Sequence, residues 1–112
     1  MRHDDLVYVG HMLDMARKAR AKVGVKTRED YDQDENLRLA LAYLVQIIGE
    51  AASRVSLSFR QAHPEIPWKN IIGTRHHVVH DYLDVDYDIV WNAVNIHLPP
   101  LISALEKLVS PA

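Results

Sequence analysis

Apolar residues recur at helical spacing along this chain, in segments separated by glycine, proline and charged residues. Near the N-terminus, one stripe follows steps of three and four and consists of Leu6, Val9, Leu13, Ala16 and Arg20. It predicts a first helix over about Asp4 to Val23. A basic turn and then Gly24 follow, which places cations against the helix dipole and a glycine at the stop.

The strongest pattern lies in the middle of the chain. Its apolar positions repeat at steps of 4-3-4-3-4 and are Leu37, Leu41, Leu44, Ile48, Ala51 and Val55. They predict a second helix from about Gln33 to Ala62, ending before Pro64, with a seam that packs against partner helices. Ahead of it, the segment VKTREDYDQDE is polar and turn-like, and Asp32 and Glu35 have the spacing of a capping box.

Two further helices are predicted in the C-terminal half. Pro67 suits the first turn of a third helix, which carries Trp68 and the residues up to Tyr82. Asp84 or Asp86 caps a fourth helix, which the Pro99-Pro100 pair should kink or break before a leucine stripe resumes. No strand pattern and no internal repeat is evident. The expected fold is all-α, an antiparallel bundle of four to five helices in one domain over residues 1–112.

Composition narrows the classes of function. Apolar residues make up 48% and charged residues 25% of the 112 positions, the balance of a soluble globular domain. The absence of cysteine excludes disulfides, thiolate zinc sites and cysteine nucleophiles. No signal-peptide pattern opens the chain and no apolar run approaches the ~20 residues of a membrane span, so we expect a cytoplasmic protein that binds no membrane.

Net charge also bears on the partners. At −2 with neutral histidines, the whole molecule does not attract nucleic acid, so a local cluster would have to hold any polyanion. One such cluster is TRHHVVHDY, residues Thr74 to Tyr82, which places an arginine, three histidines, an aspartate and a tyrosine in nine positions. It contains the pattern R-x4-H-x-Y, formed by Arg75, His80 and Tyr82.

The spacing of this pattern raises a geometric question. Five residues of a straight helix rotate by about 140°, so Arg75 and His80 would not converge on one substrate atom. Convergence requires either a helix that unwinds near His80 or a second protomer that brings its own copy of the motif. The apolar seam of the second helix, and the small-residue strip from Gly49 to Ala52, favour a homodimer.

The residue types suit the cleavage of RNA without a metal. That reaction needs a base for the proton of the 2′-hydroxyl, an acid for the leaving 5′-oxygen and a cation for the phosphoryl oxygens. An imidazole with a pKa of about 6.5 transfers protons near neutral pH. A guanidinium presents a rigid donor fork to phosphate and stabilises the transition state. A symmetric pair of motifs supplies all three roles.

Other interpretations of the same residues stay open. His80 also suits a half-exposed helix end, Arg75 a salt bridge with Asp81 or Glu50, and Tyr82 the packing of the bundle. Glu50, in the middle of the second helix, is either a paired carboxylate or the residue that orients the motif arginine or histidine.

A metal site is a weaker alternative. His76 and His80 have the i, i+4 spacing of metal ligands on a helix, with Asp84 one turn further. No second cluster of ligands occurs elsewhere in the sequence, so we expect neither a metal nor another cofactor.

The motif and three flanking blocks resemble a known family. TRHHVVHDY, with IPWKNIIG before it, IGEAA upstream and VWNAVNIHLPPL downstream, is similar to the HepT-like branch of the HEPN superfamily, whose hallmark is R-x4-6-H-x-Y on a helical bundle. The resemblance covers about Asp34 to Leu105. In bacteria and archaea such proteins resemble toxins encoded beside a small nucleotidyltransferase of the MNT type, which acts as the antitoxin.

The resemblance implies roles for particular residues. Arg75 and His80 correspond to the ribonuclease residues, in a cleft of a homodimer, and Tyr82 to the tyrosine that the partner modifies with AMP. His76 corresponds to the polar residue that follows the motif arginine. Related helical proteins have also been described as substrate-binding subunits of nucleotidyltransferases, so a non-catalytic docking subunit is the alternative function.

Overall fold

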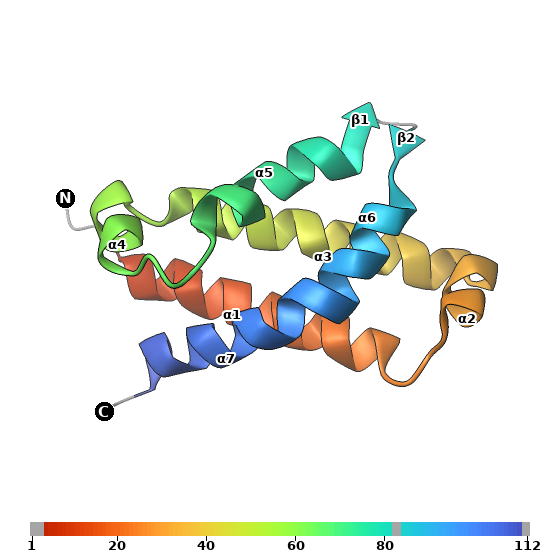
Figure 1. The fold of residues 1–112 in the computed structure, drawn as a ribbon, viewed down its shortest axis with the longest axis horizontal. Helices are drawn as coiled ribbons and strands as arrows, with labels where there is room; N and C mark the ends of the chain where they lie inside the picture. Colours follow the sequence, from red (N-terminus) through yellow and green to blue (C-terminus); the bar gives the residue numbers. More distant parts are fainter. Residues whose placement is uncertain (1–3, 82–83, 111–112) are drawn as a thin grey trace.

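The chain folds as an antiparallel helical bundle, seen in a computed structural model that describes residues 4–81 and 84–110 (Figure 1). The elements, in chain order, are α1 (Asp5–Val23), α2 (Arg28–Gln33), α3 (Glu35–Arg54), α4 (Leu57–Ala62), α5 (Trp68–Val78), β1 (Val79–Asp81), β2 (Asp84–Val85), α6 (Tyr87–Asn92), the π-helix η1 (Ala93–His97) and α7 (Leu98–Val109). The predicted all-α bundle is confirmed.

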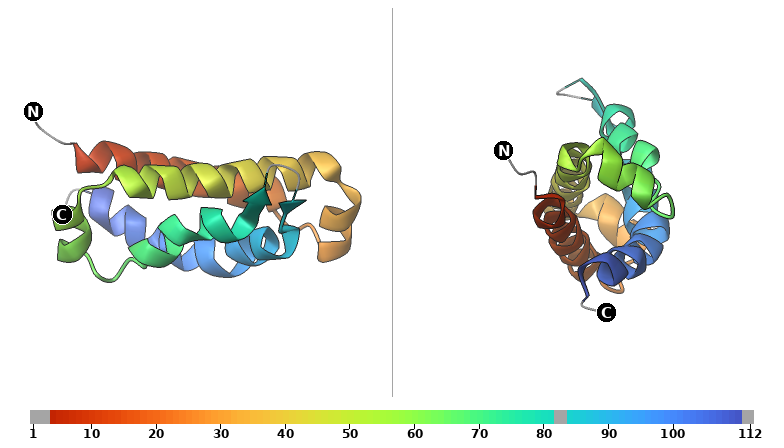
Figure 2. Two further views of the ribbon diagram at one scale, coloured as in Figure 1. Left: turned by 90° about the horizontal axis from the view of Figure 1, so that it is seen from above. Right: turned by 90° about the vertical axis from the view of Figure 1, so that its left-hand side faces the viewer.

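Four helical segments enclose the core. α3 packs against α1 on one side and α5 on the other, and the composite helix α6–η1–α7 returns along α1. Figure 2 shows these segments as a ring when the bundle is viewed from one end. Every side chain that is buried in the described part of the chain is apolar. None of the described helices has the length and apolar character needed to span a bilayer.

The apolar seam of the predicted second helix lies inside this core. All six of its residues are buried, with exposed fractions of 7% or less. Ala52, in the small-residue strip, is fully buried as well. The chain's own helices therefore cover the surface that the sequence analysis assigned to a second protomer, and the seam no longer supports a homodimer.

The predicted helix from Gln33 to Ala62 is wrong at both ends. It ends at Arg54, because Val55 is extended and Ser56 starts α4 by accepting a hydrogen bond from the Phe59 amide at 3.2 Å. The carboxylate of Asp5 accepts hydrogen bonds from the Ser56 amide and hydroxyl at 2.7 and 2.8 Å. The break is thus fixed by a contact with α1 that the local sequence does not reveal.

The polar segment before α3 forms a helix of its own, α2. Thr27 caps it, since its hydroxyl accepts from the Asp30 amide and the Asp30 carboxylate accepts from the Thr27 amide. The N-cap of α3 is Asp34, which accepts from the Leu37 amide at 3.0 Å. The capping box predicted at Asp32 and Glu35 is therefore wrong.

The proline pair changes the type of helix instead of ending it. Pro99 and Pro100 occupy the first turn of α7, directly after the five-residue π-helix. The Leu98 amide donates to the Ala93 carbonyl, the longer step of a π-helix. Prolines have no N–H to donate to the preceding turn, and the hydrogen bonds of the helix rearrange immediately before them.

Candidate active site

The motif crosses the end of α5. Thr74 to Val78 belong to the helix, whereas Val79 to Asp81 form β1, which pairs antiparallel with β2 (Asp84–Val85). The sequence analysis predicted no strand here and was wrong. Val78 is fully buried, and its carbonyl accepts from the Asp86 amide at 2.7 Å. That bond joins the end of α5 to the N-cap of α6, and the described backbone between them forms the strands β1 and β2.

The end of α5 bears on the geometric question raised by the spacing. Arg75 belongs to the last turn of α5 and His80 to β1, so a straight-helix separation does not apply to them. The helix therefore ends before His80, and the convergence of Arg75 and His80 on one substrate atom stays a prediction. Tyr82 lies outside the described residues. In the end-on view the strands stand away from the body of the bundle (Figure 2).

The neighbouring histidines of α5 are accessible to solvent. His76 and His77 are both exposed on that helix. Because α5 ends at Val78, His76 and His80 do not share a helical face, and the i, i+4 argument for a metal pair loses its geometry. Within residues 4–81 and 84–110, no three His, Cys, Asp or Glu residues are grouped so as to hold a metal ion.

Glu50 lies on the side of α3 that faces α1. Its carboxylate forms an ion pair with Arg54 one turn later, at 3.1 Å, and 43% of its side chain is exposed. The two residues line a groove that Tyr8, His11 and Met15 of α1 border on the other side. The predicted role of Glu50 in orienting the motif stays a prediction.

Asp86 is the N-cap that the sequence analysis proposed for the helix after the motif. Its carboxylate accepts hydrogen bonds from the Asp88 and Ile89 amides, each at 3.1 Å. Asp88 in turn forms an ion pair with Arg28 of α2. Hydrogen bonds to Asp32 and then to Asp88 raise the pKa of Arg28 above its usual value. The start of α6 is thereby fixed on both sides.

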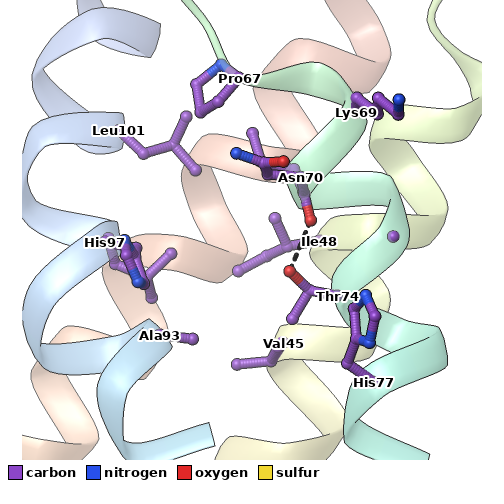
Figure 3. A pocket seen from close by; sticks show the side chains of 13 residues that line it. Val45, Ile48, Pro67, Lys69, Asn70, Thr74, His77, Ala93, His97 and Leu101 are labelled. Carbon is purple, nitrogen blue, oxygen red and sulfur yellow. Dashed lines mark hydrogen bonds between the residues drawn. The ribbon is translucent and has the colours of Figure 1, made fainter. Parts of the chain in front are cut away.

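A cavity that the sequence analysis missed lies beside the motif helix. It separates α5 from η1 and α7 and has a volume of about 510 Å³ (Figure 3). Four polar residues of α5 line one wall, Lys69 and, at helical spacing, Asn70, Thr74 and His77. His97 of η1 lines another. The spacing was visible in the sequence, but the facing wall depends on how η1 packs.

Comparison with known proteins shows which protein family has this fold and motif. The family described as "Ribonuclease HepT-like" matches residues 12–108, which include the whole motif. The chain belongs to this HepT-like family, and the resemblance seen in the sequence is confirmed.

Individual relatives agree with this assignment. A protein of Caldanaerobacter subterraneus subsp. tengcongensis named "Putative RNase" is 31% identical over 101 residues, which cover 90% of each chain. The "Probable ribonuclease HepT" of Thermococcus cleftensis is 35% identical over 80 residues, which cover 71% of this chain and 73% of that protein. No solved structure matches this chain.

Proposed function

We propose that this protein is a metal-independent endoribonuclease and acts as the toxin of a toxin–antitoxin pair. Its catalytic residues are Arg75 and His80, with support from His76 and Glu50, and its substrate is RNA. The observation that carries the proposal is the family match over residues 12–108, which spans the complete R-x4-H-x-Y pattern. The extended backbone after Val78 supports it, since it removes the helical separation of the two residues.

The chemistry follows from the residue types. An imidazole of His80 removes the proton from the 2′-hydroxyl, and the 2′-oxygen attacks the adjacent phosphorus. The bond from phosphorus to the 5′-oxygen breaks, and that oxygen receives a proton from a second imidazole. The products are a 2′,3′-cyclic phosphate and a 5′-hydroxyl. Arg75 stabilises the charge on the phosphoryl oxygens during the attack. In a homodimer, the second protomer supplies the second imidazole.

Substitution of the two motif residues tests this assignment. We expect His80→Ala to abolish RNA cleavage in the presence of EDTA. Arg75→Ala should slow it by about 100-fold or more, the ~3 kcal/mol typical of losing a donor that stabilises developing charge. Cleavage rates of a labelled oligoribonucleotide provide the measurement.

Matched variants control for general effects on the fold. His11→Ala and Arg17→Ala remove the same residue types from exposed positions of α1 and should cleave at the parental rate. All four variants should keep the parental helical circular dichroism. If folded His80→Ala cleaved RNA as fast as the parent, the alternative function would replace this one, and the motif would dock a nucleotidyltransferase without cutting RNA.

The proposed antitoxin is an MNT-type nucleotidyltransferase that adds AMP to Tyr82. In that reaction the tyrosine oxygen attacks the α-phosphorus of ATP, pyrophosphate leaves, and the phenolic proton is released. The attached phosphodiester adds negative charge beside the basic motif and competes with the RNA backbone for it. Modification therefore inactivates the toxin without unfolding it.

Mass spectrometry checks the modified residue. With the partner enzyme, ATP and magnesium, the chain should gain the mass of one adenylate on Tyr82, and Tyr82→Phe should gain none. Adenylate on another residue, or no adenylate with a partner that is active on a control substrate, would leave occlusion as the means of inhibition.

A further inference from the structure

The cavity beside α5 combines an apolar floor with a polar rim. Val45 and Ile48 of α3 form part of the floor, and Ala93 and Leu101 belong to the opposite wall. These four side chains are buried, with exposed fractions of 9% or less. Figure 3 shows Asn70 of α5 extending toward the wall that carries His97 and Leu101. A volume of about 510 Å³ lies within the range of small-molecule sites.

The polar groups at the rim have unused hydrogen-bonding capacity. The Thr74 hydroxyl donates to the Asn70 carbonyl at 2.6 Å, so it is engaged within α5. Within the part of the chain that the structure describes, the Asn70 carboxamide, the Lys69 ammonium and the His97 imidazole make no side-chain hydrogen bond or ion pair. The cavity thus offers an amide, a cation and an imidazole to a ligand.

The charges around the cavity favour an anionic ligand with a flat, partly apolar body. Among the described residues that line it there is no aspartate or glutamate. Lys69 suits a phosphate as a mobile point charge. A carboxamide such as that of Asn70 pairs with the donor and acceptor edge of a nucleobase. The exposed imidazoles of His77 and His97 present flat faces on which a base stacks.

The π-helix is an independent reason to regard the cavity as a site. Single-turn π segments are rare and occur frequently at functional sites. Here η1 begins with Ala93 and ends with His97, and both residues line the cavity. Arg20 of α1 holds the segment in place by donating to the Val94 carbonyl at 3.3 Å and to the Asn95 side chain at 3.0 Å. The wall that carries His97 is therefore fixed in advance of binding.

We propose that this cavity is a nucleotide subsite, in which one unstacked base lies on the apolar floor and its phosphate contacts Lys69. The proposal rests on the proposed ribonuclease function in one respect: the nucleotide is taken to come from an RNA substrate. The rim and the motif share α5, since His77 lies between Arg75 and His80 in the chain. An RNA strand bound at the motif therefore reaches the cavity with a neighbouring nucleotide, and single-stranded RNA presents such unstacked bases.

Gly73 offers a way to add bulk at the rim of the cavity without disturbing the fold. It lines the cavity from α5, and a Cβ atom built there meets nothing within 4 Å. Gly73→Leu should add bulk at the rim of the cavity, where it interferes with an entering base, and it replaces a glycine in a helix by a better helix former. Gly10→Leu is the matched control, because Gly10 is a helical glycine of α1 with equally open surroundings and does not line the cavity.

Binding is measured separately from cleavage. A fluorescent 2′-O-methyl oligoribonucleotide lacks the attacking hydroxyl, so its anisotropy reports affinity alone. We expect Gly73→Leu to weaken its binding by at least tenfold and Gly10→Leu to leave it unchanged, with parental thermal stability in both. Asn70→Ala should weaken binding in the same direction. Free AMP and UMP, titrated while the amide resonances of the cavity residues are followed, distinguish a mononucleotide from an RNA strand as the source.

The outcomes separate this proposal from the proposed function. If mononucleotides shift the cavity resonances and Gly73→Leu prevents it, the subsite is a nucleotide site even when the oligonucleotide does not bind. If the parent binds nucleotides in this way but cuts no RNA, the subsite stands and the ribonuclease function fails. If folded Gly73→Leu binds the oligonucleotide and the mononucleotides as the parent does, or neither ligand binds the parent, the subsite is overturned, whether or not the parent cleaves RNA.

Discussion

Tyr31 shows how one side chain turns a polar segment into structure. It is fully buried although its neighbours in α2 are exposed, and its hydroxyl donates to the Tyr87 carbonyl at 2.7 Å. Its ring lies 4.9 Å from that of Trp91, measured between ring centroids. The sequence analysis treated this segment as a turn, because a single tyrosine among charged residues gives no periodic signal.

Tyr31→Phe should destabilise the protein by about 1 kcal/mol at neutral pH, because the Tyr87 carbonyl loses its donor. Burial raises the pKa of Tyr31 above its usual value of about 10. Below that pH the phenol is protonated in both states and contributes no pH dependence. Above it, the unfolded chain loses the proton first, so the free energy of unfolding falls as pH rises. Urea denaturation between pH 7 and 11 should show a smaller fall in Tyr31→Phe.

The exposed Tyr43→Phe serves as control, since 62% of that residue is exposed. It should retain both the neutral-pH stability and the alkaline fall of the parent. Equal alkaline slopes in Tyr31→Phe and the parent would mean that burial of this phenol does not couple to folding.

Among the elements, η1 depends on a single cation from another helix. Arg20 occupied the apolar stripe of the predicted first helix, and in the structure it points into the bundle and reaches η1. The Asn95 amide donates to the Trp91 carbonyl at 3.0 Å, which extends this contact to α6. A π segment leaves backbone groups without their usual hydrogen-bond partners. Here the side chains of Arg20 and Asn95 form hydrogen bonds with some of these groups.

Arg20→Ala should therefore lower the free energy of unfolding by about 1.5–3 kcal/mol, the range for hydrogen bonds to charged groups. Arg17→Ala, one turn earlier, removes an exposed ion pair with Glu106 and should change it by less than about 1 kcal/mol. Chemical denaturation of both variants gives the comparison. Similar losses in the two would show that η1 does not depend on Arg20.

The sequence predicted some elements well and failed on others for physical reasons. The first helix and the Asp86 cap follow from local signals, a stripe with a glycine stop and a short polar side chain before an apolar run. The break at Ser56 coincides with a contact to Asp5, more than 50 residues away, and the strands β1 and β2 lie between Val78 and Asp86, which a backbone hydrogen bond joins. Tertiary contacts of this kind leave no local pattern.

In the candidate site, too, some features were predicted from the sequence and others were not. Arg75 and His80 were identified because their spacing is a sequence motif, and the family match includes both positions. The cavity was missed because its walls come from α3, α5 and η1, and no sequence pattern indicates where those helices separate. Glu50 was predicted either to be a paired carboxylate or to orient the motif; the structure shows its ion pair with Arg54, and its role in orienting the motif stays a prediction.

At the scale of the whole molecule, the apolar surface that is free for self-association differs from the seam that the sequence analysis proposed. The apolar seam of α3 is internal, but Leu39 and Tyr43 of the same helix are 51% and 62% exposed. They lie one turn apart and form an apolar strip on the outside of the bundle. A second protomer packed here remains compatible with the proposed homodimer.

Light scattering at micromolar concentration should report at least twice the 12.8 kDa of one chain. Tyr43→Asp should shift the mass toward that of a monomer and reduce RNA cleavage together with it. Val25→Asp, at a fully exposed position between α1 and α2, should change neither. A parent that stays monomeric yet cleaves RNA would exclude a site completed by a second protomer.

The ends of the cleaved RNA test the central claim most directly. A purified protein that acts through an imidazole and a guanidinium, without a metal, should cut RNA in EDTA. Mass spectrometry should then find a 2′,3′-cyclic phosphate on one fragment and a 5′-hydroxyl on the other, and the matching DNA should stay intact because it lacks the attacking hydroxyl. Cleavage that requires a divalent ion, or that leaves 5′-phosphate and 3′-hydroxyl ends, would contradict the assignment of Arg75 and His80.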